Sequence, residues 1–122
     1  MRPWILLTLE PMTVPFDLVQ PRRVLSGGER IRDVADVVRE FGRRCLVVTG
    51  SQPERAAVVV DALVRAWIAH ELWFVSGEPT FDSVREAAEA ARSFAPDVVV
   101  AMGGGSVIDT AKAVAMLLTN GG

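Results

Sequence analysis

Hydrophobic positions along the chain follow two alternating patterns: short continuous apolar runs, and apolar residues spaced three and four apart. The first pattern is typical of strands buried on both faces, and the second is typical of amphipathic helices. Runs expected to form strands lie at 22–26, 45–49, 72–75 and 98–102, and helical spacing is found at 29–41, 53–69, 80–95 and 106–118. Strands that alternate with helices of this length predict an α/β fold, with a Rossmann-like open parallel sheet and helices on both faces.

The N-terminal segment, residues 1–21, departs from this alternation. It contains Pro3, Pro11, Pro15 and Pro21. Because proline cannot donate a hydrogen bond to a sheet, we expect an irregular arm or an edge strand here. Residues 22–122 are then expected to form one domain, since a chain of 122 residues has the length of a single domain.

Composition excludes several classes of protein. Half of the residues are hydrophobic and 23% are charged, which is typical of a globular chain rather than a disordered one. The net charge of −2 comes without a basic block, so we expect no nucleic-acid or membrane partner. The apolar segment 4–7 is too short to span a membrane, and no small-residue cleavage site follows it. The single cysteine, Cys45, begins an apolar run, which predicts a buried, inert thiol in a cytoplasmic protein.

The most informative stretch is the apolar run 98–102, which leads through three glycines, Gly103, Gly104 and Gly105, into helical spacing that begins at Ser106. Glycines permit a tight turn and a close approach by a ligand, because no Cβ is present. A strand, a glycine turn and a helix start together direct free amide groups and the positive end of the helix toward an anion. This arrangement predicts a phosphate or dinucleotide site.

A purely structural interpretation stands beside this one. Ser106-x-x-Asp109 also fits a capping box, in which both side chains satisfy helix amides and nothing is bound. The dinucleotide fingerprint G-x-G-x-x-G is incomplete, since Gly103 and Gly105 fit but Ile108 stands at the third glycine. A capping role needs at most one glycine, so three in succession favour the binding interpretation.

Other glycine-bearing turns follow the predicted strands. Gly50 follows the run 45–49, and Gly77-Glu78-Pro79 follows the run 72–75. The carboxyl ends of parallel strands share one edge of a sheet, where ligands of such folds bind. We therefore expect these turns to meet the glycine triplet at that edge, whereas Gly27-Gly28 is expected to be an ordinary turn.

The segment 103–112, GGGSVIDTAK, resembles the GGGSxxDxAK signature of the iron-containing (group III) alcohol dehydrogenases. Segments 77–80 and 119–121 extend the resemblance, which covers the chain from about Arg22 onward. It implies an NAD(P)-binding domain of a metal-dependent alcohol dehydrogenase, which transfers hydride between an alcohol or aldehyde and the nicotinamide. The residues that it implies in cofactor binding are Gly50, Glu78, Gly103, Gly104, Gly105, Ser106 and Asp109, of which 103–106 bind the pyrophosphate and Asp109 lies beside the nicotinamide half.

Three positions refine this resemblance. NAD-preferring members often have aspartate where this chain has Gly50, so loss of that carboxylate permits a 2′-phosphate and favours NADP over NAD. Glu78 stands where many members have asparagine, which weakens the cofactor contact implied for that turn. Lys112 matches the signature lysine, although a solvated helix lysine would look the same.

The family holds Fe²⁺ or Zn²⁺ with one aspartate and three histidines of a C-terminal domain. This sequence has one histidine, His70, which matches no ligand motif, so we expect neither a metal site nor a catalytic residue here. The chain ends at Gly122, where the family continues into its second domain, so we expect this chain alone to be inactive. Apolar surface intended for that domain predicts a homo-oligomer. A cyclase domain similar to dehydroquinate synthase and a non-catalytic flavodoxin-like module remain as alternatives.

Overall fold

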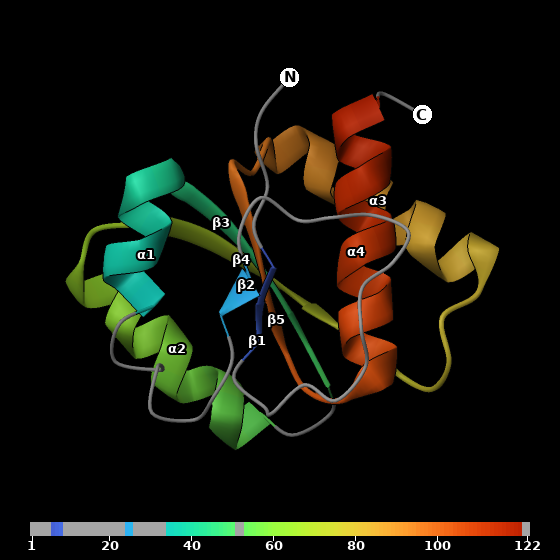
Figure 1. The fold of residues 1–122 in the computed structure, drawn as a ribbon, viewed down its shortest axis with the longest axis horizontal. Coiled ribbons are helices and arrows are strands. Elements are labelled where there is room, and N and C mark those ends of the chain that lie inside the picture. The colour runs from blue at the N-terminus through green and yellow to red at the C-terminus, as the bar shows by residue number, and fades with distance from the viewer. Residues whose placement is uncertain (1–5, 9–23, 26–33, 51–52, 121–122) are drawn as a thin grey trace.

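A parallel sheet of five strands forms the centre of the molecule (Figure 1). The computed structural model describes residues 6–8, 24–25, 34–50 and 53–120. The strands are β1 (Leu6–Thr8), β2 (Val24–Leu25), β3 (Arg44–Thr49), β4 (Ala69–Phe74) and β5 (Val98–Met102). The helices are α1 (Val34–Phe41), α2 (Pro53–Arg65), α3 (Phe81–Phe94) and α4 (Gly105–Asn120). The order in the sheet is β2-β1-β5-β3-β4, and every pairing is parallel, which confirms the predicted fold class.

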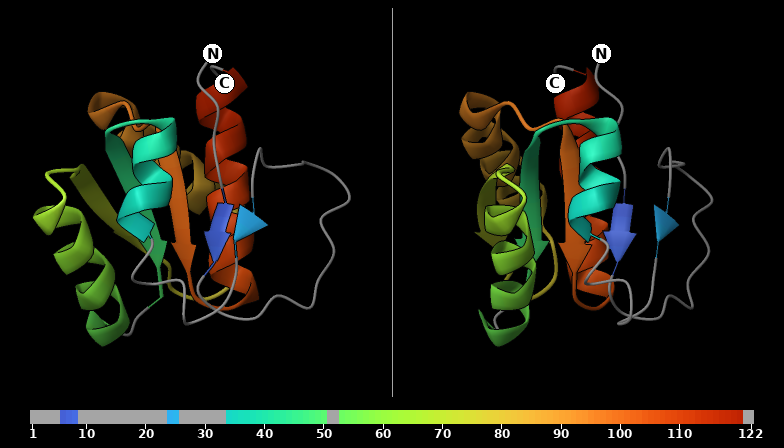
Figure 2. Two further views of the ribbon diagram at one scale, coloured as in Figure 1. Left: turned by 60° about the vertical axis from the view of Figure 1, so that its left-hand side comes forward. Right: turned by 90° about the vertical axis from the view of Figure 1, so that its left-hand side faces the viewer.

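Helices cover both faces of this sheet, with α1 and α2 on one side and α3 and α4 on the other (Figures 1 and 2). Two hydrophobic clusters fill the two interfaces. Cys45 and Val47 of β3 belong to the cluster under α1 and α2, whereas Leu46 and Val48 belong to the cluster under α3 and α4. Alternate side chains of a strand point to opposite faces, so β3 and β5 require continuous apolar runs. This is why these two strands are the ones most plainly predicted from the sequence.

The short strand β1 differs from the expectation of an irregular arm or an edge strand. It pairs with β2 on one side and with β5 on the other, so Leu6–Thr8 lies inside the sheet. Leu6 is the register partner of Val99, which places this segment next to the central strand. The prolines that motivated the expectation, and the Gly27-Gly28 turn, lie outside the described residues.

The end of α2 also differs from the predicted helix at 53–69. The helix stops at Arg65 because Trp67 adopts a left-handed conformation, with φ of 60°. The Ile68 amide donates to the Leu63 carbonyl at 3.0 Å, and the Trp67 amide donates to the Val64 carbonyl at 3.1 Å. These two bonds form a Schellman motif, which satisfies the last carbonyls of the helix. The apolar residues that follow Arg65 continue the helical spacing of the sequence, which is why the predicted helix is too long. The predicted strand 72–75 accordingly begins three residues after the observed start of β4 at Ala69.

The start of α3 agrees with the sequence. Thr80 is the N-cap, and its hydroxyl accepts a hydrogen bond from the Ser83 amide at 3.0 Å. The Ser83 hydroxyl in turn accepts from the Thr80 amide at 2.9 Å, which completes a capping box. This cap fixes α3 immediately after the Gly77-Glu78-Pro79 turn.

Candidate functional site

The carboxyl ends of β3 and β5 form the point at which the chain switches between the two faces of the sheet. The strands are neighbours, and Thr49 is the register partner of Met102. The helix that follows β3 packs on one face, whereas the helix that follows β5 packs on the other. In open α/β sheets, a crevice outside the strand ends is found where successive helices diverge in this way, and ligands bind there. Gly50 and Gly103 are the residues that leave the two strands at this point.

Gly103 is required by the fold itself. Its φ is +151°, which side-chain-bearing residues rarely adopt. A Cβ at this position would lie 2.7 Å from Cγ2 of Val107, so α4 packs directly over the glycine. A Cβ at Gly50 would lie 3.7 Å from the same methyl group, which is an ordinary contact. One methyl group of Val107 therefore lies beside both glycines, at the ends of β3 and β5.

Gly104 and Gly105 have no such explanation in the packing of the chain. A Cβ on either residue would meet nothing within 4 Å, and both residues are exposed. Gly105 is also the first residue of α4, where glycine stabilises a helix less than alanine does. Packing therefore requires neither glycine, and both leave open space beside a helix start. They permit a ligand to approach the backbone closely.

The N-terminus of α4 is suited to an anion. Ile108 donates its amide to the Gly104 carbonyl at 3.1 Å, and the amides before it are those that a helix cannot satisfy internally. The first turn has no acidic side chain that could neutralise the positive end of the helix. Because α4 begins at Gly105, Ser106 lies inside the helix rather than at its N-cap, and its backbone carbonyl accepts a bond from the Thr110 hydroxyl at 2.8 Å. The alternative of a Ser106–Asp109 capping box is therefore wrong.

The turn between β4 and α3 joins the same site. Gly77 has φ of +73°, and the loop between β4 and α3 passes beside the start of α4 (Figure 1). The Ser106 hydroxyl donates to Oε1 of Glu78 at 3.2 Å. Segments 28 residues apart are thus in contact. The sequence predicts that this turn meets the glycine triplet, but not the particular hydrogen bond between Ser106 and Glu78.

The predicted cofactor-binding residues accordingly fall into two groups. Gly50, Glu78 and residues 103–106 converge at the carboxyl edge of the sheet. Asp109 is exposed on α4, one turn beyond Gly105. Lys112 is half-buried on the same helix.

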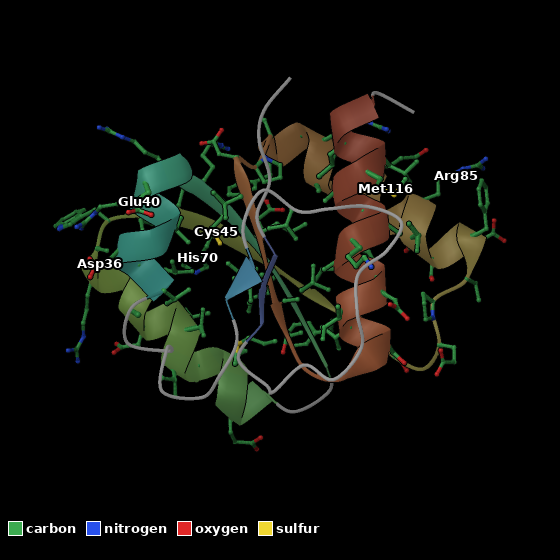
Figure 3. The ribbon with its side chains drawn as sticks, viewed as in Figure 1. Asp36, Glu40, Cys45, His70, Arg85 and Met116 are labelled. Carbon is green, nitrogen blue, oxygen red and sulfur yellow. The ribbon has the colours of Figure 1, made fainter. Side chains whose placement is uncertain are left out.

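Cys45 and His70 lie at the opposite, amino edge of the sheet (Figure 3). They are register partners near the starts of β3 and β4. Complete burial raises the pKa of the Cys45 thiol, which keeps it neutral and unreactive, as predicted. His70 is half-buried, and its Nδ1 lies 3.3 Å from the Ile68 carbonyl oxygen. Neither residue reaches the glycine triplet.

No group of three or more His, Cys, Asp or Glu side chains in the described ranges is placed to hold a metal ion. None of the helices in the same part of the chain is long and apolar enough to cross a membrane.

A parallel sheet with a glycine triplet at its switch point defines a Rossmann-like domain of the nucleotide-binding type. The model of the family "Iron-containing alcohol dehydrogenase" matches residues 21–122, and the chain belongs to this family. The match favours the dehydrogenase over the cyclase related to dehydroquinate synthase. It also accounts for the GGGSVIDTAK segment at the start of α4.

Individual relatives agree with this assignment. The chain is 30% identical to the sulfoacetaldehyde reductase of Bilophila wadsworthia, over 83% of this chain and 27% of that protein. It is 30% identical to the NADH-dependent butanol dehydrogenase A of Clostridium acetobutylicum, over 82% of this chain and 27% of that protein. The crystal structure of an iron-containing alcohol dehydrogenase from Thermotoga maritima superposes with a TM-score of 0.68 and 28% identity, covering 99% of this chain and 30% of that one. The chain thus spans about a quarter of the length of these curated relatives.

Proposed function

We propose that this chain is the NAD(P)-binding domain of a metal-dependent alcohol dehydrogenase, and that the turn 103–106 binds the cofactor pyrophosphate. The observation that carries the proposal is the open space over Gly104 and Gly105 at the start of α4. Free amides there and the positive end of the helix would donate to phosphate oxygens, and the Ser106 hydroxyl would add a further donor. Family membership of the chain supports the same assignment.

In the whole enzyme, the bound nicotinamide supplies or accepts the hydride that interconverts an alcohol and an aldehyde. The part of this chain is to bind and orient the cofactor. Gly103, Gly104 and Gly105 would fix the pyrophosphate, and Asp109, one turn further along α4, would lie beside the nicotinamide half. The relatives contain roughly three times as much further sequence, and we propose that the Fe²⁺ or Zn²⁺ site belongs to that part. Within this scheme residues 22–122 form the binding domain.

We further propose that the domain accepts NADP, and prefers it to NAD. The observation behind this is Gly50 at the carboxyl end of β3, next to Gly103. An acidic side chain after this kind of strand binds the ribose hydroxyls and repels a 2′-phosphate. Glycine removes that repulsion. Among the relatives, the butanol dehydrogenase A of Clostridium acetobutylicum is NADH-dependent, so a preference for NADP would distinguish this chain from that protein.

The test is a fluorescence titration of the full 122-residue chain with NADPH and NADH. The main variant is Gly104→Asp, whose side chain would extend into open space and place a negative charge at the phosphate position. Ala90→Asp adds the same charge at an exposed position of α3 and is the matched control. We expect binding to fall about tenfold or more in Gly104→Asp, since a like charge at short range costs 1.4 kcal/mol or more, and to be unchanged in Ala90→Asp. Equal binding by the two variants would overturn the pyrophosphate assignment.

A further inference from the structure

The carboxylate of Glu78 accepts the hydrogen bond of a hydroxyl that the proposed function assigns to the phosphate. Its Oε1 accepts the hydrogen bond of the Ser106 hydroxyl at 3.2 Å, beside the N-terminal turn of α4. That turn has no acidic residue of its own, so Glu78 brings a negative group to it from another element. Negative groups are stabilised near helix N-termini by the same field that attracts phosphate.

We propose that Glu78 is an internal competitor for the phosphate position and thereby sets the affinity of this domain for its dinucleotide. The inference rests on the proposed function. In the free protein the Glu78 carboxylate holds the Ser106 hydroxyl. When the cofactor binds, its pyrophosphate replaces the carboxylate, and Glu78 turns away into solvent.

The chemistry of Ser106 makes the two states exclusive. A serine hydroxyl has one hydrogen to donate, so it bonds either the carboxylate or a phosphate oxygen. Both acceptors are anions, and like charges held a few ångströms apart repel each other. Binding of the cofactor must therefore break the Ser106–Glu78 bond and move the carboxylate away.

The local structure permits this exchange without disturbing the fold. Glu78 is exposed, and it lies in the turn after Gly77 rather than in a helix or strand. The Thr80–Ser83 capping box fixes α3 two residues further on, so the displacement needs only the side chain of Glu78. The competing group is an exposed side chain, whereas the glycine turn is held in place by the contact between Gly103 and Val107.

Removal of the charge tests the proposal. Glu78→Gln retains the size of the side chain and removes its negative charge, and Glu86→Gln makes the same change at an exposed position of α3 as the matched control. ADP and NADH probe the phosphate position, and adenosine, which has no phosphate, probes the remainder of the site. We expect Glu78→Gln to bind ADP and NADH about three- to tenfold more tightly, because the interaction of two partly exposed charges has this size. Adenosine binding is expected to stay unchanged, as is ADP and NADH binding to Glu86→Gln.

Two further measurements separate the proposal from other roles of Glu78. High salt screens exposed charges, so the advantage of Glu78→Gln is expected to shrink as salt is added. In a Ser106→Ala background the shared hydroxyl is gone, so the gain from Glu78→Gln is expected to be smaller than in the native background. An equal gain in both backgrounds would show that competition for the hydroxyl is not involved.

The outcomes also distinguish this inference from the proposed function. If ADP and NADH bind the native chain and are lost in Gly104→Asp, but Glu78→Gln binds them equally or more weakly, only the role of Glu78 is overturned. Weaker binding would mean that Glu78 holds the cofactor, for example through a ribose hydroxyl. If the native chain, Glu78→Gln and Gly104→Asp all fail to bind ADP and NADH, the proposed function and the role of Glu78 both fail.

Discussion

Replacement of Gly103 by alanine tests the difference between a glycine that the fold requires and a glycine that a ligand requires. At Gly103 the backbone φ of +151° excludes most side chains, and a Cβ would lie 2.7 Å from Cγ2 and 3.0 Å from Cβ of Val107. At Gly104 a Cβ would meet nothing within 4 Å. Gly103→Ala is therefore expected to affect stability, and Gly104→Ala is expected to affect binding.

The loss of stability expected for Gly103→Ala has two parts. An unfavourable backbone conformation costs about 1–3 kcal/mol, and an extra methyl group in a packed contact costs about 1–3 kcal/mol. Their sum, about 2–6 kcal/mol, is a large share of the roughly 5–15 kcal/mol that is typical of a folded domain. For Gly104→Ala we expect a change within about 0.5 kcal/mol, as at other open surface positions.

Val107 provides an internal check on this reasoning. It is almost fully buried, so Val107→Ala by itself is expected to destabilise the domain by about 1–3 kcal/mol. In the double variant Gly103→Ala/Val107→Ala, loss of the Val107 γ-methyl groups removes the 2.7 Å contact with the new methyl group at position 103. The double variant is therefore expected to be more stable than the sum of the single changes by about 1 kcal/mol, and the remaining loss reports the backbone strain together with the 3.0 Å contact to the Cβ that alanine retains at position 107.

The assay is urea unfolding followed by the fluorescence of the three tryptophans, with NADPH titration of the same samples. The midpoint and slope of each transition give the free energy of unfolding. Gly103→Ala is expected to lower it and Gly104→Ala to leave it unchanged, whereas Gly104→Ala is expected to weaken NADPH binding. Native stability in Gly103→Ala, or strict additivity with Val107→Ala, would refute the described contact between the glycine turn and α4.

Two further predictions concern positions away from the triplet. Gly50→Asp fits sterically, because its Cβ would lie 3.7 Å from Val107. It is expected to weaken NADPH binding at least about tenfold relative to NADH binding, because the new carboxylate repels the 2′-phosphate. An unchanged ratio of NADPH affinity to NADH affinity would contradict the role of Gly50. Trp67→Gly is expected to stabilise the domain by about 1 kcal/mol relative to Trp67→Ala, since only glycine adopts the left-handed φ of 60° without strain. Both substitutions at Trp67 remove a side chain that is 94% exposed, so little packing is lost. The difference in free energy of unfolding between the two variants, measured in urea, therefore reports the backbone strain. Equal stability of the two would indicate that Trp67 is not strained.

The sequence by itself determined the elements whose signals are local. Continuous apolar runs predicted β3 and β5, because strands buried on both faces cannot carry polar residues on either side. Thr80 predicted the start of α3, because a cap is a contact among neighbouring residues. The glycine triplet and the helical spacing after it predicted the strand-turn-helix unit that leads into α4.

Only the tertiary structure decided which segments are neighbours. It placed β1 between β2 and β5, and set the switch point between β3 and β5 by sending α2 and α4 to opposite faces. It showed that Gly103 lies against Val107 whereas Gly104 is open, although the two are adjacent in sequence. It also brought Glu78 to Ser106 across 28 residues. Hydrophobic periodicity reports whether a residue is buried, but not against which distant residue it packs, and the candidate site is made of such distant contacts.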